Sequence, residues 1–137
     1  MKNAVRSQHY EPLRRARTFI ERHYDQPITL ERISREAGFS PFHFIRLFRA
    51  VYKLTPHQYL IQCRIAKAKQ LLQGDELNVT EICYAVGFES LGSFSTLFRR
   101  TVGLTPSAYR KSAQDRRRGF IPQCFQVKLG IGAASDG

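Results

Sequence analysis

The chain has 137 residues, and its 22 lysines and arginines against 11 acidic residues give it a formal net charge of +11. This length suits one compact domain or two very small subdomains, and the positive charge favours a polyanionic partner, of which nucleic acid is the commonest in a cell. The start of the chain lacks the apolar core of a signal peptide, and no apolar run is long enough to span a bilayer. These features argue against secretion and against a membrane partner, so the cytoplasm is the expected location.

The first predicted elements are two helices separated by a short loop. Apolar residues at helical spacing indicate a helix over about residues 12–24. A second, short helix is expected to begin after Thr29, whose hydroxyl can cap it, and to end at Gly38, where glycine permits a left-handed turn. The apolar positions of the two helices are Leu13, Ala16, Ile20, Leu30, Ile33 and Ala37.

A third predicted helix completes a helix-turn-helix unit over about residues 10–54. Ser40 and Pro41 are a strong start signal, because serine caps a helix N-terminus and proline is pre-set for the first helical turn. Two short helices joined by a tight glycine turn are typical of the helix-turn-helix. The side chains of the third helix that the 3.6-residue period points inward are Phe44, Leu47, Phe48 and Val51.

A long linker helix is predicted next, over about residues 56–72. Thr55 and Pro56 open it, and Gly74 with Asp75 stops it. Its apolar positions are Leu60, Ile61, Ile65, Ala68, Leu71 and Leu72.

The second predicted unit covers about residues 79–111. Thr80 is expected to cap its first helix, and a last short helix begins at Thr105 and Pro106. Residues 113–137 show little helical pattern and are expected to form a partly disordered tail. The inward positions of the unit are Ile82, Val86, Phe94, Leu97 and Phe98.

The two units are copies of one supersecondary element, so we expect an all-α protein. When Gly38-Phe39 is aligned with Gly87-Phe88, the later positions match after a slip of a single residue. A plain helical bundle with duplicated hairpins would explain the apolar residues equally well, but it would not explain the charge. The further matches are Ile33 with Ile82, Phe44 with Phe94, Leu47 with Leu97, Phe48 with Phe98, Arg49 with Arg99, Leu54-Thr55-Pro56 with Leu104-Thr105-Pro106, and Tyr59 with Tyr109.

The outward face of the first unit's last helix mixes apolar and cationic side chains. Phe42, Ile45, Arg46 and Arg49 fall at i, i+3, i+4 and i+7, which places them in one stripe. Arg46 can fork onto guanine O6 and N7, whereas Phe42 and Ile45 can contact thymine methyl groups. Arg49 is expected at a phosphate. The stripe therefore favours DNA recognition, with a protein–protein patch as the alternative.

The matching face of the second unit is small and polar. It consists of Gly92, Ser95, Thr96 and Arg99, with Leu91 at the start of the helix. Such a face can approach a groove closely, but it offers less discrimination between bases. We therefore expect the first unit to supply most of the sequence specificity, and the second to supply grip and register.

Hydroxyls and free amides at helix starts are candidate contacts to the DNA backbone, because both can donate to phosphate. Arginines beside them can add charge-assisted contacts. The full set of candidate backbone contacts is Ser40, His43, Arg49, Thr55, Ser90, Ser93, Arg99, Arg100, Thr105 and Arg110.

The residues that carry most catalytic and metal chemistry are scattered. Cys63, Cys83 and Cys124 form no CxxC pair and no Cys/His cluster, so we expect no disulfide framework, metal site or cofactor. The four histidines and three cysteines show no nucleophile–base spacing, and no glycine-rich phosphate loop precedes a helix. The sequence therefore argues against an enzyme. A thiol-based sensor is a weaker alternative.

Three segments of the chain carry a distinctive pattern. Residues 33–47 read ISREAGFSPFHFIRL, the linker helix carries Arg64, Ala68 and Leu71-Leu72, and residues 86–110 read VGFESLGSFSTLFRRTVGLTPSAYR. With these segments the chain, from about residue 10 to 112, resembles the AraC/XylS family of bacterial transcription regulators. The last segment matches the family signature of Gly-Phe, an aromatic-rich helix and then Gly-x-Thr-Pro-x-x-Tyr-Arg.

The resemblance implies a mode of DNA binding. Two helix-turn-helix subdomains joined by a rigid helix would enter two successive major-groove segments of double-stranded DNA, about 34 Å apart. The resemblance also implies recruitment of RNA polymerase, usually as an activator. Two positions that often hold long polar side chains in the family are Leu91 and Gly92 here. By position, the base contacts of the family fall on Phe42, Ile45, Arg46, Leu91, Gly92 and Thr96.

Most relatives carry an additional ligand-binding or dimerisation domain, and this length leaves no room for one. We therefore expect a stand-alone DNA-binding domain over residues 8–112, monomeric and without a small-molecule effector; the Met1 start favours this over an excised fragment. Two rival classes remain. A DNA-repair methyl acceptor would need a zinc-binding module that is missing, and a protein-interaction module could sequester another regulator through Phe42 and Ile45.

Overall fold

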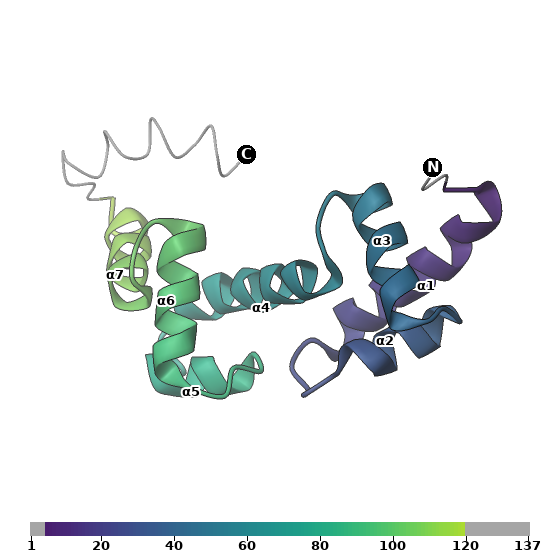
Figure 1. Ribbon diagram of the computed structural model, residues 1–137. Coiled ribbons are helices and arrows are strands. Elements are labelled where there is room, and N and C mark those ends of the chain that lie inside the picture. The colour runs from purple at the N-terminus through teal and green to yellow at the C-terminus, as the bar shows by residue number, and fades with distance from the viewer. Residues whose placement is uncertain (1–4, 120–137) are drawn as a thin grey trace.

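The computed structural model describes residues 5–119 of the chain, and in this range it forms seven α-helices and no strand (Figure 1). The prediction of an all-α fold with two helix-turn-helix units is confirmed. The helices are α1 (Ser7–His23), α2 (Leu30–Ala37), α3 (Pro41–Tyr52), α4 (Pro56–Leu72), α5 (Val79–Ala85), α6 (Leu91–Val102) and α7 (Pro106–Arg117).

The helices form two units, and the long helix α4 runs from one unit to the other (Figure 1). The first half of α4 packs into the unit of α1, α2 and α3, where Leu60 joins the buried core around Phe44 and Phe48. The second half packs into the unit of α5, α6 and α7, where Ile65 and Leu72 join the core. Each end of the linker helix is therefore anchored in one of two separate hydrophobic cores.

The local sequence signals place most helix ends as predicted. Thr29 caps α2 by accepting a hydrogen bond from the backbone N–H of Arg32, and Gly38 ends that helix at φ 78°. Ser40 caps α3 and Pro41 occupies its first turn. In the second unit Gly87 makes the corresponding turn at φ 105°. Positive φ strains any residue with a Cβ, which is why glycine stands at both turns.

Three helix boundaries differ from the prediction. Helix α1 begins at Ser7 rather than near Pro12, because the His9 side chain accepts a hydrogen bond from the backbone N–H of Arg6 and so caps an earlier first turn. Helix α5 is capped by Asn78, not by Thr80. Asn78 and Glu81 exchange side chain–backbone hydrogen bonds of 2.8 and 2.9 Å, which form a capping box.

The third difference concerns the predicted tail. Helix α7 continues to Arg117, so the tail does not begin at residue 113. Ala113 is buried, and Gln114 donates a hydrogen bond of 2.5 Å to Asp75 in the loop after α4. These tertiary contacts extend a segment whose own sequence is too polar to show a helical period. The rest of the tail, with Cys124, lies outside the described residues.

The inward residues of α3 and α6 follow the predicted phase. The rings of Phe44, Phe48, Phe94 and Phe98 are fully buried. At the edges of the two cores some residues expected inside are only half-buried, although they still pack against the buried clusters: Val51 and Leu97.

Candidate nucleic-acid interface

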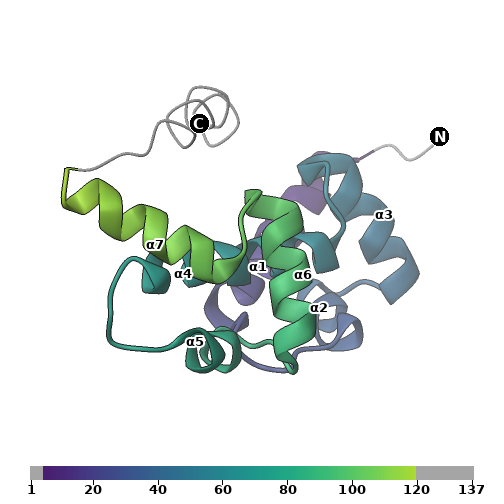
Figure 2. The ribbon, with the colours of Figure 1, turned by 90° about the vertical axis from the view of Figure 1, so that its left-hand side faces the viewer.

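Helices α3 and α6 lie toward the same side of the molecule. Both stand roughly upright in Figure 1, one in each unit, and both lie to the right of α7 when the molecule is turned in Figure 2. The similar poses follow from the internal repeat, because each of these helices begins at a serine cap after a glycine turn. The two helices therefore lie toward one side of the molecule with the linker helix α4 between them (Figure 1).

The outer face of α3 carries an exposed aromatic ring beside a guanidinium group. Phe42 is 71% exposed, and the guanidinium carbon of Arg46 lies 5.4 Å from the centre of its ring. Arg49 is exposed one turn further along, whereas Ile45 is half-buried. Among the large hydrophobic side chains that the structure describes, Phe42 has the highest exposed fraction. Cation–π stacking holds the arginine fork at the surface of the helix.

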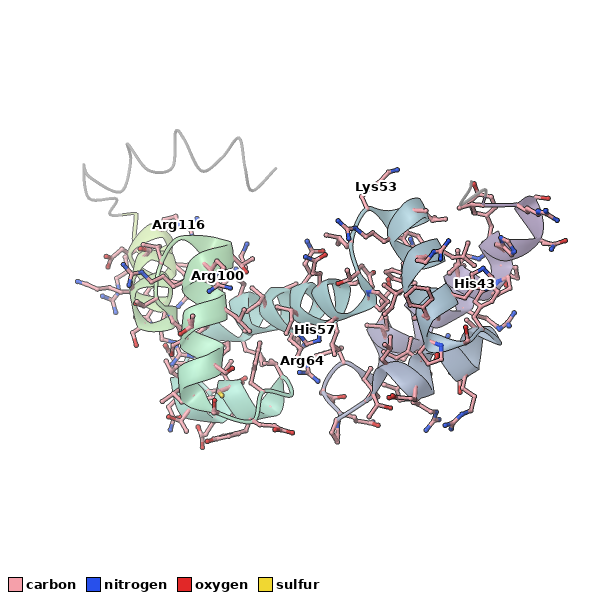
Figure 3. All side chains as sticks on the ribbon, viewed as in Figure 1. His43, Lys53, His57, Arg64, Arg100 and Arg116 are labelled. Carbon is pink, nitrogen blue, oxygen red and sulfur yellow. The ribbon has the colours of Figure 1, made fainter. Side chains whose placement is uncertain are left out.

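The start of α3 is held in place by aromatic contacts to α1. The rings of His9 and Phe39 meet edge to face at a centroid distance of 5.8 Å, and Phe39 meets His43 at 5.3 Å. The exposed His43 side chain, labelled in Figure 3, therefore contacts the Phe39 ring, which in turn contacts His9 of α1. This packing fixes the angle at which the N-terminus of α3 leaves the unit.

The outer face of α6 is smaller and smoother. Leu91 is 39% exposed, and a Cβ added to Gly92 would meet no atom within 4 Å. Thr96 is exposed and Ser95 is half-buried. The backbone at Gly92 is therefore open to close approach by a partner. The predicted contrast between a bulky first face and a small second face is present in the structure.

The predicted backbone contacts fall into two groups. Most are exposed at the starts or last turns of α3, α6 and α7. Among the cap residues, Ser40 accepts a hydrogen bond from the N–H of His43, and Ser90 accepts one from Ser93. A serine hydroxyl that accepts in this way still has its own proton to donate. The exposed members are Ser40, His43, Arg49, Ser90, Ser93, Arg99, Arg100 and Thr105.

Arg110 and Thr55 are placed differently. The Nε of Arg110 donates to the Leu72 carbonyl at 3.1 Å, and its terminal nitrogen donates to the Leu71 carbonyl at 3.5 Å. The half-buried guanidinium thus caps the C-terminus of α4, so the structure assigns Arg110 to packing within the second unit rather than to an outward contact. Thr55 is half-buried and caps α4.

Three ion pairs of the first unit lie within α1 and α2. Ion pairs join Arg17 with Glu21 at 3.7 Å and Arg32 with Glu36 at 3.4 Å, and another joins Glu11 with Arg14. The Glu11–Arg14 and Arg32–Glu36 pairs are exposed to solvent, where each contributes little to stability, whereas Arg17 is half-buried.

The thiols described by the structure are protected. Burial raises the pKa of Cys83, and burial together with the charge of Glu21 raises the pKa of Cys63. Both thiols are therefore held in the protonated form, which is the less reactive one. Residues 5–119 contain no group of three or more side chains suited to holding a metal ion, and none of their helices is long and apolar enough to cross a membrane.

The sequence did not lead us to predict that Arg64 contacts both units. It lies midway along α4 between the two units, where Figure 3 shows it beside His57. The signal was present, because Leu60, Arg64 and Ala68 follow one another at i, i+4 and i+8 on the buried stripe of the linker helix. A cation on such a stripe needs a specific partner.

Comparison with known proteins identifies the family. A family model described as a helix-turn-helix domain matches residues 33–112. The regulatory protein SoxS of Salmonella typhimurium is 34% identical over 92 residues, which cover 67% of this chain and 86% of SoxS. A crystal structure of a regulator with an AraC-type DNA-binding domain from Chromobacterium violaceum has a TM-score of 0.70 at 27% identity, covering 79% of this chain and 96% of that one. The chain belongs to the AraC/XylS family of transcription regulators.

Two other transcription regulators extend the comparison. The DNA-binding domain of AdpA, a global transcriptional factor whose crystal structure contains a target DNA, is 31% identical with a TM-score of 0.74, covering 78% of this chain and 96% of that one. The transcriptional regulator YdeC of Bacillus subtilis is 39% identical over 93 residues, 68% of this chain. This match covers 32% of YdeC, so the chain spans about a third of the length of several curated relatives.

Proposed function

We propose that this protein binds specific double-stranded DNA and regulates transcription, with α3 and α6 as the helices that enter two successive major-groove segments. The observation that carries the proposal is that α3 and α6, one in each unit, lie toward one side of the molecule (Figures 1 and 2), and that both helices expose outer residues such as Arg46 and Thr96. A helix with its side chains is about 10–12 Å across, which matches a major groove about 12 Å wide. The domain of AdpA, similar in fold and sequence, was crystallised with its target DNA.

Direct base recognition is assigned mainly to α3. Arg46 carries a planar fork that can pair with guanine O6 and N7, and the exposed ring of Phe42 can contact a thymine methyl. Ile45 lies half-buried beside them and offers the edge of an aliphatic side chain. On α6 the smaller candidate base contacts are Leu91, Gly92, Ser95 and Thr96.

Contacts to phosphate set the register of the two helices. The exposed cap residues Ser40 and Ser90 stand at the N-termini of α3 and α6, and each keeps a hydroxyl proton that can be donated to a phosphate. Arg49, Arg99 and Arg100 add charge nearby. At the start of α7 the exposed Thr105 hydroxyl caps the helix by accepting from the Ala108 N–H and keeps its own proton to donate.

The wider role follows from the family. We infer that the regulator acts by binding alone, in the bacterial cytoplasm, as a monomer without a small-molecule effector. Activation through contact with RNA polymerase is the mode that family membership supports. Neither of these steps requires catalysis by the protein itself.

Arg46→Ala tests the base-reading role of α3. The variant should lose about 1–3 kcal/mol of binding free energy on a cognate site and should discriminate less between bases at one position. Arg22→Ala removes the same charge from the cleft between α1 and α2, away from α3, and is the matched control. The measurement is a duplex titration of each variant on the cognate site and on single-base variants. An equal loss on all sequences would make Arg46 a phosphate contact instead.

The small face of α6 leads to a second prediction. Randomising the base pairs beneath α6 should reduce affinity less than randomising those beneath α3, because Gly92 and Ser95 offer few groups that distinguish bases. Competition between two partly randomised duplexes in one binding reaction measures the difference. Stronger dependence on the α6 segment would overturn the assignment of specificity to α3.

A further inference from the structure

Three segments from different parts of the chain meet at Arg64. Its Nε donates to the Tyr24 carbonyl at 2.6 Å, and its terminal nitrogen donates to the Gln26 carbonyl at 3.0 Å. Its guanidinium carbon lies 5.7 Å from the ring centre of Phe88. One side chain of the linker helix therefore contacts the loop after α1 in the first unit and the turn before α6 in the second.

Gly87 of the second unit lies against the same loop of the first unit that Arg64 contacts. It adopts φ 105°, and a Cβ at this position would lie 2.7 Å from the Tyr24 carbonyl oxygen and 2.9 Å from Arg64 Nε. The turn of the second unit is thus in direct backbone contact with the loop of the first. The Tyr24 side chain packs against both hydrophobic cores.

The contacts at this junction explain how the charged side chain of Arg64 can be half-buried. Removing a guanidinium from water is costly unless its N–H groups find acceptors. Two carbonyls fill that need, and the carboxylates of Asp25 and Glu89 lie near enough to favour the charged form. Burial is the larger influence and lowers the pKa of Arg64. These two directed hydrogen bonds also hold the guanidinium group of Arg64 in one position.

Beside the junction the two units are not closely packed. A cleft of about 660 Å³ opens between them, lined from the first unit by Ile28, from α4 by His57 and from the second unit by Leu97. Without further contacts, the angle between the units would depend on the stiffness of α4. The junction of Arg64, Gly87 and the Tyr24–Gln26 loop adds a second point of attachment away from the axis of that helix.

We propose that this junction fixes the orientation of α3 relative to α6, and that Arg64 and Gly87 are positioning residues which set the spacing of the DNA segments the protein accepts. The statement about spacing rests on the proposed DNA-binding function. The statement about orientation does not.

Orientation is tested without DNA by residual dipolar couplings of the backbone amides. In the wild-type protein the couplings of residues 5–52 and of residues 79–117 should fit one alignment tensor. In Arg64→Gln and in Gly87→Ala the two units should require separate tensors while each keeps its dispersed spectrum. Arg110→Gln is the matched control, because Arg110 makes the same kind of bond to the Leu71 and Leu72 carbonyls inside the second unit. It should keep one tensor.

Spacing is tested on the DNA that the wild-type protein selects from a random pool. The wild type should lose affinity when one or two base pairs are inserted between the two contacted segments. In Arg64→Gln and Gly87→Ala the affinity for the optimal spacing should fall about tenfold, because looser units have a lower effective concentration at the second site. The ratio between optimal and altered spacing should shrink toward one.

The outcomes separate the two proposals. If the couplings of both units fit one alignment tensor in Arg64→Gln and also in Gly87→Ala, as in the wild type, the proposal that the junction fixes the orientation is wrong, whatever the DNA result. Loosened units in a protein that binds no duplex would support the junction and overturn the proposed function.

Discussion

Phe48→Ala should lower the free energy of unfolding by about 3–5 kcal/mol, the usual cost of removing a buried phenylalanine. Phe48 is fully buried, and its ring contacts Phe44, Tyr52 and Tyr59 at centroid distances of 5.5, 4.7 and 6.0 Å. Because a small protein is stable by only about 5–15 kcal/mol, this loss should be plain in denaturant unfolding. Phe98→Ala should have a similar effect on the second unit.

Phe42→Ala is the matched control on the same helix. Phe42 is 71% exposed, so its loss should change stability by less than about 0.5 kcal/mol while weakening DNA binding. The pair separates packing from recognition with one substitution type on one helix. Unaltered stability in Phe48→Ala, or strong destabilisation in Phe42→Ala, would show that the phase of α3 is wrong.

Raising the salt concentration should weaken DNA binding steeply. Each phosphate neutralised contributes about −0.9 to the slope of log affinity against log salt, so six to ten contacts would reduce affinity by about 10³–10⁵ between 50 and 200 mM. The protein carries a net charge of +11, and its candidate phosphate contacts include Arg49, Arg99 and Arg100. Fluorescence anisotropy of a labelled duplex at several salt concentrations measures the slope.

The same titration discriminates against the rival function. A module that sequesters a protein through Phe42 and Ile45 would bind mainly by apolar contact and would respond weakly to salt. Replacing Arg99 by glutamine should reduce the slope by about one if it contacts a phosphate. A flat salt response would contradict DNA binding through the phosphate backbone.

The fold was predictable because local signals and the internal repeat agree. Ser40-Pro41 and Thr55-Pro56 mark helix starts whose hydrogen bonds involve neighbours only three residues away, so the sequence alone specifies them. The buried phases of α3 and α6 follow from the spacing of their phenylalanines. The second copy then repeats the argument independently, which is why the number and order of the central helices were predicted correctly.

The errors arose where a residue's environment is set by distant parts of the chain. Arg110 is expected at the DNA backbone from the sequence, but its Nε donates to the carbonyl of Leu72 at the end of α4, which lies 38 positions earlier in the chain. Helix α7 continues past Ala113 because the loop at Asp75 binds Gln114. Arg64 was noted only as part of a family pattern, since its two partners lie about forty positions earlier in the chain.

The outer faces of α3 and α6 are exposed at most of the predicted positions, although Ile45 and Ser95 are half-buried, and their contacts to bases and phosphates stay predictions. Exposure and amphipathic phase could be read from spacing, because they depend on the helix itself. Which side chain meets which base depends on the partner and on the angle between the units.

Selection of bound sequences from a pool of random double-stranded DNA tests the central idea most directly. The purified full chain should enrich a single, unsymmetrical motif in two parts, with their centres about one helical turn, or 10 base pairs, apart. The part beneath α3 should be the more sharply defined. Recovery of unenriched DNA, or of a motif confined to one groove segment, would contradict recognition by two helix-turn-helix units acting together.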